Sequence, residues 1–114
     1  MPQIDWFAPK KENIFGHKKK LDFLAQELLE FTRSRGKVPG EIKVLDLGCG
    51  NCEAVTFPLA SLGFDLTGVD MFAPAIEYAR AKNPYPNLQL VLGDLHQLEF
   101  AGKFDAIVAA DILY

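Results

Sequence analysis

The sequence Asp46-Leu-Gly-Cys-Gly50 links a short apolar segment to a segment with helical periodicity. Gly48 and Gly50 permit positive φ angles and lack the Cβ atoms that would keep a ligand away from the backbone. The start of a following helix adds unpaired N–H groups and the positive end of a dipole. Such a turn can bind a polar or anionic cofactor, although a tight turn without a ligand would have the same sequence.

Acidic residues stand at the carboxyl ends of three later apolar segments. They are Asp70, Asp94 and Asp111. Asp70 follows the glycines by about 20 residues, the spacing at which a carboxylate can accept hydrogen bonds from the two hydroxyls of a ribose. A purely structural role is the alternative, because the same carboxylate could cap the helix expected from Pro74.

Alternating strands and helices must position these residues. Apolar, partly β-branched runs predict strands, and apolar residues at helical spacing predict helices. Strands buried on both faces and separated by helices indicate parallel βαβ units, so we expect a Rossmann-like, doubly wound α/β sheet. Pro58 predicts a kink or a late start in the second helix. The expected helices are 17–35, 53–62 and 74–82, and the expected strands are 42–47, 64–69, 88–92 and 104–110.

The first sixteen residues lack a sustained apolar period, so we divide the chain into an N-terminal arm, 1–16, and a domain, 17–114. Trp6, Phe7 and Phe15 are expected to cover the ligand cleft, because these aromatic side chains otherwise have no partner.

Composition bounds the class of protein. A chain of 114 residues that is 49% hydrophobic can bury one core. The net charge of −3 and the short lysine clusters do not favour nucleic acid. No apolar run approaches the ~20 residues that span a bilayer, and no signal peptide precedes the domain, so we expect a cytoplasmic protein. Two cysteines with His17 and His96 far away in sequence form no metal-ligand set.

Four motifs, in order, resemble those of the class I S-adenosylmethionine-dependent methyltransferases. They are Val44-Leu-Asp-Leu-Gly-Cys-Gly50, Thr67-Gly-Val-Asp70, Gly93-Asp94 and Phe104-Asp-Ala-Ile-Val108. The resemblance covers residues 42–114 and implies strand order 3-2-1-4, truncated relative to the family's seven strands. It implies methyl transfer from S-adenosylmethionine to an acceptor, which we expect to be a small molecule. The resemblance does not identify a catalytic base.

The resemblance also implies a role for the glycine turn. Gly48, Cys49 and Gly50 would pass under the methionine part of the cofactor, and Asp46 would support their loop. Cys52 stands where the family usually has glycine, so loop geometry or cofactor affinity could differ here.

Further roles follow for the residues after the other strands. Asp70 would hold the ribose hydroxyls, and Met71 would pack on the adenine. Asp94 and the backbone of Leu95 would recognise the adenine edge, and Asp111 would lie near the sulfonium.

Three alternatives stay open. Cys49-Gly-Asn-Cys52 is compatible with a thioredoxin-type redox motif. A nicotinamide or flavin domain would share the sheet, but it favours glycine where this chain has Glu53. A non-catalytic domain could keep the cofactor fold. In addition, an exposed fourth strand would favour self-association.

Overall fold

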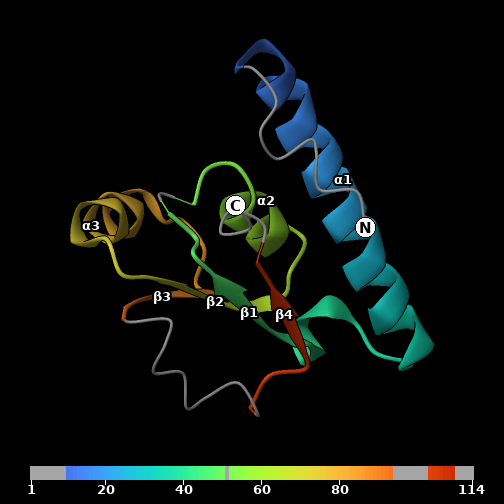
Figure 1. Cartoon of the computed structure of the whole chain (residues 1–114). Helices are drawn as coiled ribbons and strands as arrows, with labels where there is room; N and C mark the ends of the chain where they lie inside the picture. Colours follow the sequence, from blue (N-terminus) through green and yellow to red (C-terminus); the bar gives the residue numbers. More distant parts are fainter. Residues whose placement is uncertain (1–9, 51, 94–102, 110–114) are drawn as a thin grey trace.

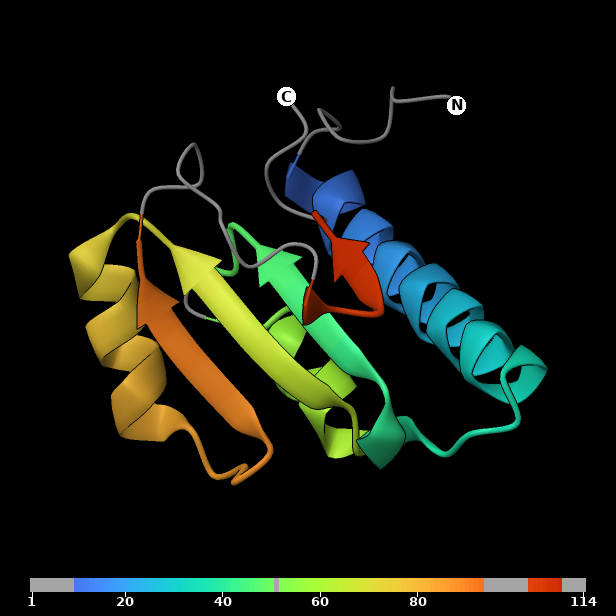
Figure 2. The same ribbon diagram turned by 90° about the horizontal axis from the view of Figure 1, so that it is seen from below.

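The central element is a parallel sheet of four strands. A computed structural model describes residues 10–50, 52–93 and 103–109, with side chains from Lys19 onward. The strands are β1 (Lys43–Leu47), β2 (Asp65–Asp70), β3 (Leu88–Leu92) and β4 (Ala106–Val108), all parallel. Their order is β3-β2-β1-β4, which confirms the predicted class and strand order. All four carboxyl ends therefore lie at one edge of the sheet (Figures 1 and 2).

Three helices lie on the same face of this sheet. They are α1 (Lys10–Ser34), α2 (Thr56–Ser61) and α3 (Ala73–Lys82). Figure 1 shows them together above the sheet, and Figure 2 shows the opposite face. In the described part of the chain no helix covers that opposite face, so one of the two helical layers of a doubly wound fold is seen.

The core fills the space between the sheet and these helices. Its members are apolar side chains that the strands and helices direct toward one another; at its centre lie Val44, Leu59, Phe64, Leu66 and Ile76. Each large side chain of this kind stabilises the fold by about 1.5–3 kcal/mol when it leaves water. The core thus fixes the helices against the sheet and, with them, the loops at the carboxyl edge.

Two helices begin three or more residues away from their expected starts. The first helix begins at Lys10 and not at His17, so residues 10–16 of the proposed arm are helical. Gly16 lowers helix propensity by about 1 kcal/mol, but extending an existing helix gains one hydrogen bond per residue. The second helix begins at Thr56 and not at residue 53, which confirms the late start predicted from Pro58.

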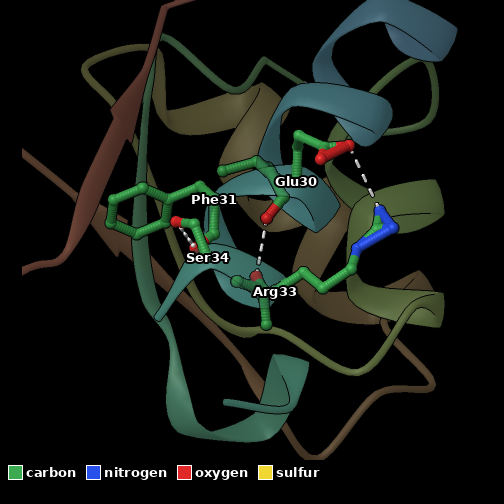
Figure 3. Close-up of polar contacts among 6 residues, drawn as sticks. Glu30, Phe31, Arg33 and Ser34 are labelled. Carbon is green, nitrogen blue, oxygen red and sulfur yellow. Dashed lines mark hydrogen bonds and ion pairs between the residues drawn. The ribbon is translucent and has the colours of Figure 1, made fainter. Parts of the chain in front are cut away.

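The C-terminal turn of α1 is closed by local polar contacts. The Arg33 guanidinium lies 3.4 Å from the Glu30 carboxylate, and the Ser34 hydroxyl donates to the Phe31 carbonyl at 2.8 Å (Figure 3). Gly36 then adopts φ +65°, a conformation that ends helices and favours glycine. The helix ends at Ser34, one residue before the expected end.

The two edges of the sheet differ. On β3 the carbonyls of Leu88 and Leu90 point away from β2, and side chains of the α3 region donate to both. Asn83 Nδ2 reaches the Leu88 oxygen at 3.1 Å, and Arg80 Nη2 reaches the Leu90 oxygen at 2.9 Å. On β4 the pairing with β1 directs the N–H and C=O of Ile107 outward, where no described residue bonds to them. Side chains block the β3 edge, whereas within the described ranges the outward groups of β4 remain available for pairing.

Candidate functional site

The glycine turn curls over the end of the neighbouring strand. The N–H groups of Gly48 and Cys49 both donate to the Val69 carbonyl, at 2.7 and 3.1 Å. Gly48 and Gly50 have φ angles of +71° and +58°. A Cβ atom added at Gly50 would meet nothing within 4 Å. The loop therefore presents bare backbone to open space, as close approach of a ligand requires.

Asp70 connects this loop to the start of α3. Its Oδ2 accepts a hydrogen bond from the Gly50 N–H, and its Oδ1 accepts one from the Phe72 N–H, both at 2.9 Å. Phe72 is the N-cap residue of α3, and this helix has no side-chain cap hydrogen bond, so Asp70 orders the chain before α3 but does not cap it as the structural alternative expected. A carboxylate has about four acceptor positions, and these bonds use two of them. Binding ribose hydroxyls thus remains compatible with the structural contacts.

Asp46 lies below the loop with only 2% of its surface exposed. The Thr56 hydroxyl donates to its Oδ2 at 2.6 Å, which ties the end of β1 to the first residue of α2. A buried carboxylate is tolerated only when hydrogen bonds replace its water. Thr56 was not predicted from the sequence. The feature that could have identified it is a hydroxyl in the first turn of the helix that follows a buried acidic residue.

Cys52 occupies a conformation that favours glycine. Its φ angle is +74°, and it is the one non-glycine residue with positive φ in the described ranges. Its N–H donates to the Cys49 carbonyl at 3.0 Å, which closes a turn. This geometry explains why a glycine is usual here in the methyltransferases that the sequence resembles. The turn also separates Gly50 from α2. The helix whose dipole was expected next to the glycines is only six residues long and begins at Thr56.

Cys49 and Cys52 are both free and buried, with 4% and 1% of their surfaces exposed. The side-chain hydrogen bond that Cys49 shares with Cys52, together with burial, holds the pKa of Cys49 far above its usual range. The same hydrogen bond lowers the pKa of Cys52. A thioredoxin-type site needs a reactive first cysteine. The raised pKa of Cys49 argues against that alternative.

Gly68 makes room for the first of these cysteines. A Cβ atom at Gly68 would stand 3.0 Å from the Cys49 Sγ and 3.2 Å from the Leu90 Cδ2. The Thr67-Gly-Val-Asp70 motif therefore requires glycine for packing, in addition to the carboxylate that ends it. The sequence shows the residue but not this neighbour, because strand register decides which side chain lies over it.

Apolar side chains surround Asp70 at the rim of the sheet. Met71 is 63% exposed, Phe72 is similarly exposed, and Leu92, which pairs with Asp70 in the β2–β3 ladder, is 48% exposed. Large apolar side chains exposed together at a strand end mark surfaces that bind ligands. Phe72 and Leu92 were not among the residues selected from the sequence.

Glu53 points toward α3. The Tyr78 hydroxyl donates to its Oε2 at 2.6 Å, and this hydrogen bond raises the pKa of Tyr78. The contact holds the segment after Cys52 against α3. It supports the loop from outside and assigns neither residue a catalytic role.

Several predicted residues lie outside the described ranges. Asp94, Leu95 and Asp111 belong to this group, as do Trp6 and Phe7. Their roles stay predictions. The structure thus brings the other predicted residues together. Gly48, Cys49 and Gly50 form the turn, Asp46 and Asp70 hold it in place, and Met71 follows Asp70.

Two kinds of feature are absent from the described residues. No helix among them is long and apolar enough to cross a bilayer. No cluster of three or more histidine, cysteine or acidic side chains in the same residues could hold a metal ion.

The fold and loop first define a class: a Rossmann-like α/β domain whose glycine turn and second-strand carboxylate are suited to a cofactor that contains a nucleoside. Residues 44–114 match the model of the family described as "Methyltransferase domain". The chain belongs to this family and is a class I S-adenosylmethionine-dependent methyltransferase domain.

Known proteins agree with this assignment. The chain is 34% identical over 73 residues to YqeM of Bacillus subtilis (strain 168), which is named as a methyltransferase; the match covers 62% of this chain and 29% of YqeM. Magnesium protoporphyrin IX methyltransferase from Synechocystis PCC 6803 with bound S-adenosylhomocysteine is 25% identical, with a TM-score of 0.68 over 90% of this chain and 46% of that one. Coclaurine N-methyltransferase is 26% identical, with a TM-score of 0.54 over 75% and 26%. The chain spans less than half of each relative.

The contact between Thr56 and Asp46 can be tested by stability. Thr56→Val keeps the shape of the side chain but removes the hydroxyl from a buried carboxylate. We expect the free energy of unfolding to fall by about 1.5–3 kcal/mol, the range for hydrogen bonds to charged groups. Urea denaturation measures this change. Thr56→Ser retains the hydroxyl and should lose much less; equal losses for the two variants would contradict the assigned bond.

The positive φ of Cys52 predicts that glycine and alanine substitutions rank in opposite order of stability at Cys52 and at Cys49. A non-glycine residue at positive φ costs about 1–2 kcal/mol, so Cys52→Gly should be more stable than Cys52→Ala by about 1 kcal/mol. At Cys49, which lacks positive φ, alanine should be the more stable substitution. Thermal or urea unfolding of the four variants compares the two positions. The same order at both would refute the effect of backbone conformation.

Proposed function

We propose that this chain binds S-adenosylmethionine at the carboxyl edge of its sheet, as part of a methyltransferase that acts on a small-molecule acceptor. The observation that carries the proposal is the hydrogen bond between the Asp70 carboxylate and the Gly50 N–H. It joins the glycine turn of one strand to the acid of the next. Family membership and relatives named with bound S-adenosylmethionine or S-adenosylhomocysteine support the choice of cofactor.

The residues present fit this cofactor. Gly48 and Gly50 leave the backbone open beneath its methionine part, and Cys49 lies between them with its side chain turned into the core. Asp70 has acceptor positions left for the two ribose hydroxyls, and the exposed Met71 side chain offers an apolar surface to the adenine. Asp94 and Leu95 are proposed at the adenine edge, and Asp111 is proposed near the sulfonium.

The bound cofactor would supply a methyl group already activated by a sulfonium. This chain would then contribute position and electrostatics, without a nucleophile of its own. Asp70 fixes the ribose because two backbone N–H groups hold its carboxylate in one orientation. Asp46 keeps the turn in place through Thr56. None of the described residues is assigned as a catalytic base.

The acceptor is proposed to be a small molecule. Two relatives support this: the Synechocystis enzyme is named for magnesium protoporphyrin IX, and coclaurine N-methyltransferase is named with bound N-methylheliamine. The cytoplasm is the proposed location, since two buried cysteines that are free thiols in the fold fit a reducing compartment.

Cofactor binding tests the proposal directly. Calorimetry should detect binding of S-adenosylmethionine and S-adenosylhomocysteine, with no binding of NAD. Asp70→Ala removes the charged acceptor from the ribose and the loop, so we expect affinity to fall about 10- to 100-fold, equivalent to about 1.5–3 kcal/mol.

Asp105 provides the matched control for that variant. Its carboxylate also accepts a backbone hydrogen bond, from the Lys43 N–H at 2.9 Å, but it stands at the amino end of the sheet. Asp105→Ala should leave cofactor affinity unchanged. Binding of NAD alone, or equal losses in the two variants, would overturn the assignment.

We also propose that the isolated chain self-associates through the β4 edge, because the outward N–H and C=O of Ile107 can pair with a second copy. Ile107→Pro removes that N–H while sparing the bonds to β1, so sedimentation velocity should show more monomer. Ile107→Ala keeps the N–H and separates backbone pairing from the effect of the exposed side chain. A wild-type chain that sediments as a monomer would disprove this association.

A further inference from the structure

The two cysteines of the glycine turn converge on one atom. Cys49 Sγ lies 3.7 Å and Cys52 Sγ lies 3.8 Å from the carbonyl oxygen of Gly50. Methyl transfer uses neither thiol. Both sulfurs nevertheless border the residue whose N–H bonds to Asp70. A change in either sulfur would act directly on the loop that the cofactor would contact.

The backbone between the cysteines suits a covalent bond. The Cys52 N–H donates to the Cys49 carbonyl at 3.0 Å, the bond of a four-residue turn. Such a turn holds its end Cα atoms within about 7 Å of each other, and disulfides span Cα separations of about 4.4–6.8 Å. Both sulfurs also lie within hydrogen-bonding distance of the same carbonyl oxygen.

The two thiols differ in chemical character. The hydrogen bond that the two thiols share lowers the pKa of Cys52, although burial opposes this. The pKa of Cys49 is raised. Cys52 is therefore the thiol that reacts first with an oxidant, and Cys49 is positioned to react second.

We propose that Cys49 and Cys52 form a reversible intrachain disulfide that reshapes the glycine turn and weakens binding of S-adenosylmethionine. The effect on binding rests on the proposed function, while formation of the disulfide does not. Burial of both thiols restricts the oxidant to a small peroxide that can enter when the loop opens.

The chemistry balances with hydrogen peroxide as oxidant. Cys52 attacks one peroxide oxygen, the O–O bond breaks, and a sulfenic acid and one water result. The Cys49 sulfur then attacks the Cys52 sulfur, the S–O bond breaks, and the second water leaves with the Cys49 proton. Two thiols are oxidised to one disulfide, and one peroxide is reduced to two waters. An added dithiol reverses the reaction by exchange.

Strand β2 lies against the Cys49 sulfur, so formation of the disulfide is expected to move the glycine turn and not the strand. Cys49 Sγ stands 3.0 Å from where a Cβ at Gly68 would lie, so the sulfur already rests on the β2 backbone. A bond of about 2.05 Å to the Cys52 sulfur would draw the Cys49 side chain off this contact and toward the turn. That shift moves the Gly50 peptide and strains its N–H bond to Asp70.

The test treats the reduced full chain with hydrogen peroxide and measures its intact mass, the amide NMR signals of Gly48 and Gly50, and its affinity for S-adenosylmethionine. We expect the loss of two hydrogen masses, shifted signals for both glycines, and affinity lower by about tenfold or more. Added dithiothreitol should restore all three. Cys49→Ser and Cys52→Ser should show none of these changes.

Other results would overturn the inference. They are an unchanged mass, a gain of oxygen atoms without a disulfide, a disulfide between two chains, or an intrachain disulfide that leaves the glycine signals and the affinity in place. Cys52→Gly serves as a second control if a serine variant does not fold. If the reduced chain fails to bind S-adenosylmethionine, the proposed function and the effect on binding both fall, while mass and NMR still decide whether the disulfide forms and moves the turn.

Discussion

The site depends on one carboxylate that holds two neighbouring loops in register. Asp70 accepts hydrogen bonds from Gly50 and Phe72, which lie 20 residues before it and two residues after it. Parallel pairing of β1 with β2 brings these loops to one edge, but pairing alone would leave their ends free to separate. With Asp70 in place, the glycine turn and the start of α3 form one unit. A ligand that bonds to the remaining acceptor positions of Asp70 meets a surface already ordered.

The second constraint is the space available for side chains around the sulfur atoms of Cys49 and Cys52. Cys49 packs on Gly68, and its thiol contacts Cys52, whose backbone has the positive φ that glycine adopts without cost. The chain thus uses glycine where a strand needs space and cysteine where a turn favours glycine. This combination fills the core below the turn, and it also places two thiols next to the Gly50 carbonyl.

The sequence predicts much of this arrangement, because strand order and the placement of acids follow from periodicity and from the resemblance. It does not predict contacts that depend on register or on local competition. Helix α1 starts at Lys10 because propagation overcomes Gly16, and α2 starts at Thr56 because Pro58 fits only a first turn. Thr56, Phe72 and Leu92 escape notice because their importance arises from what lies opposite them in space.

The charge of the site favours one kind of cofactor over another. Asp46 and Asp70 lie near enough to the turn that their charges help to raise the pKa of Cys49. A pyrophosphate would meet repulsion from both carboxylates, whereas a ligand with a sulfonium and an ammonium would be attracted. Asp46 also cannot withdraw into water, since it is buried and held by Thr56. The fixed negative charge beneath the glycines would therefore favour a cationic cofactor over a pyrophosphate, and S-adenosylmethionine carries both a sulfonium and an ammonium.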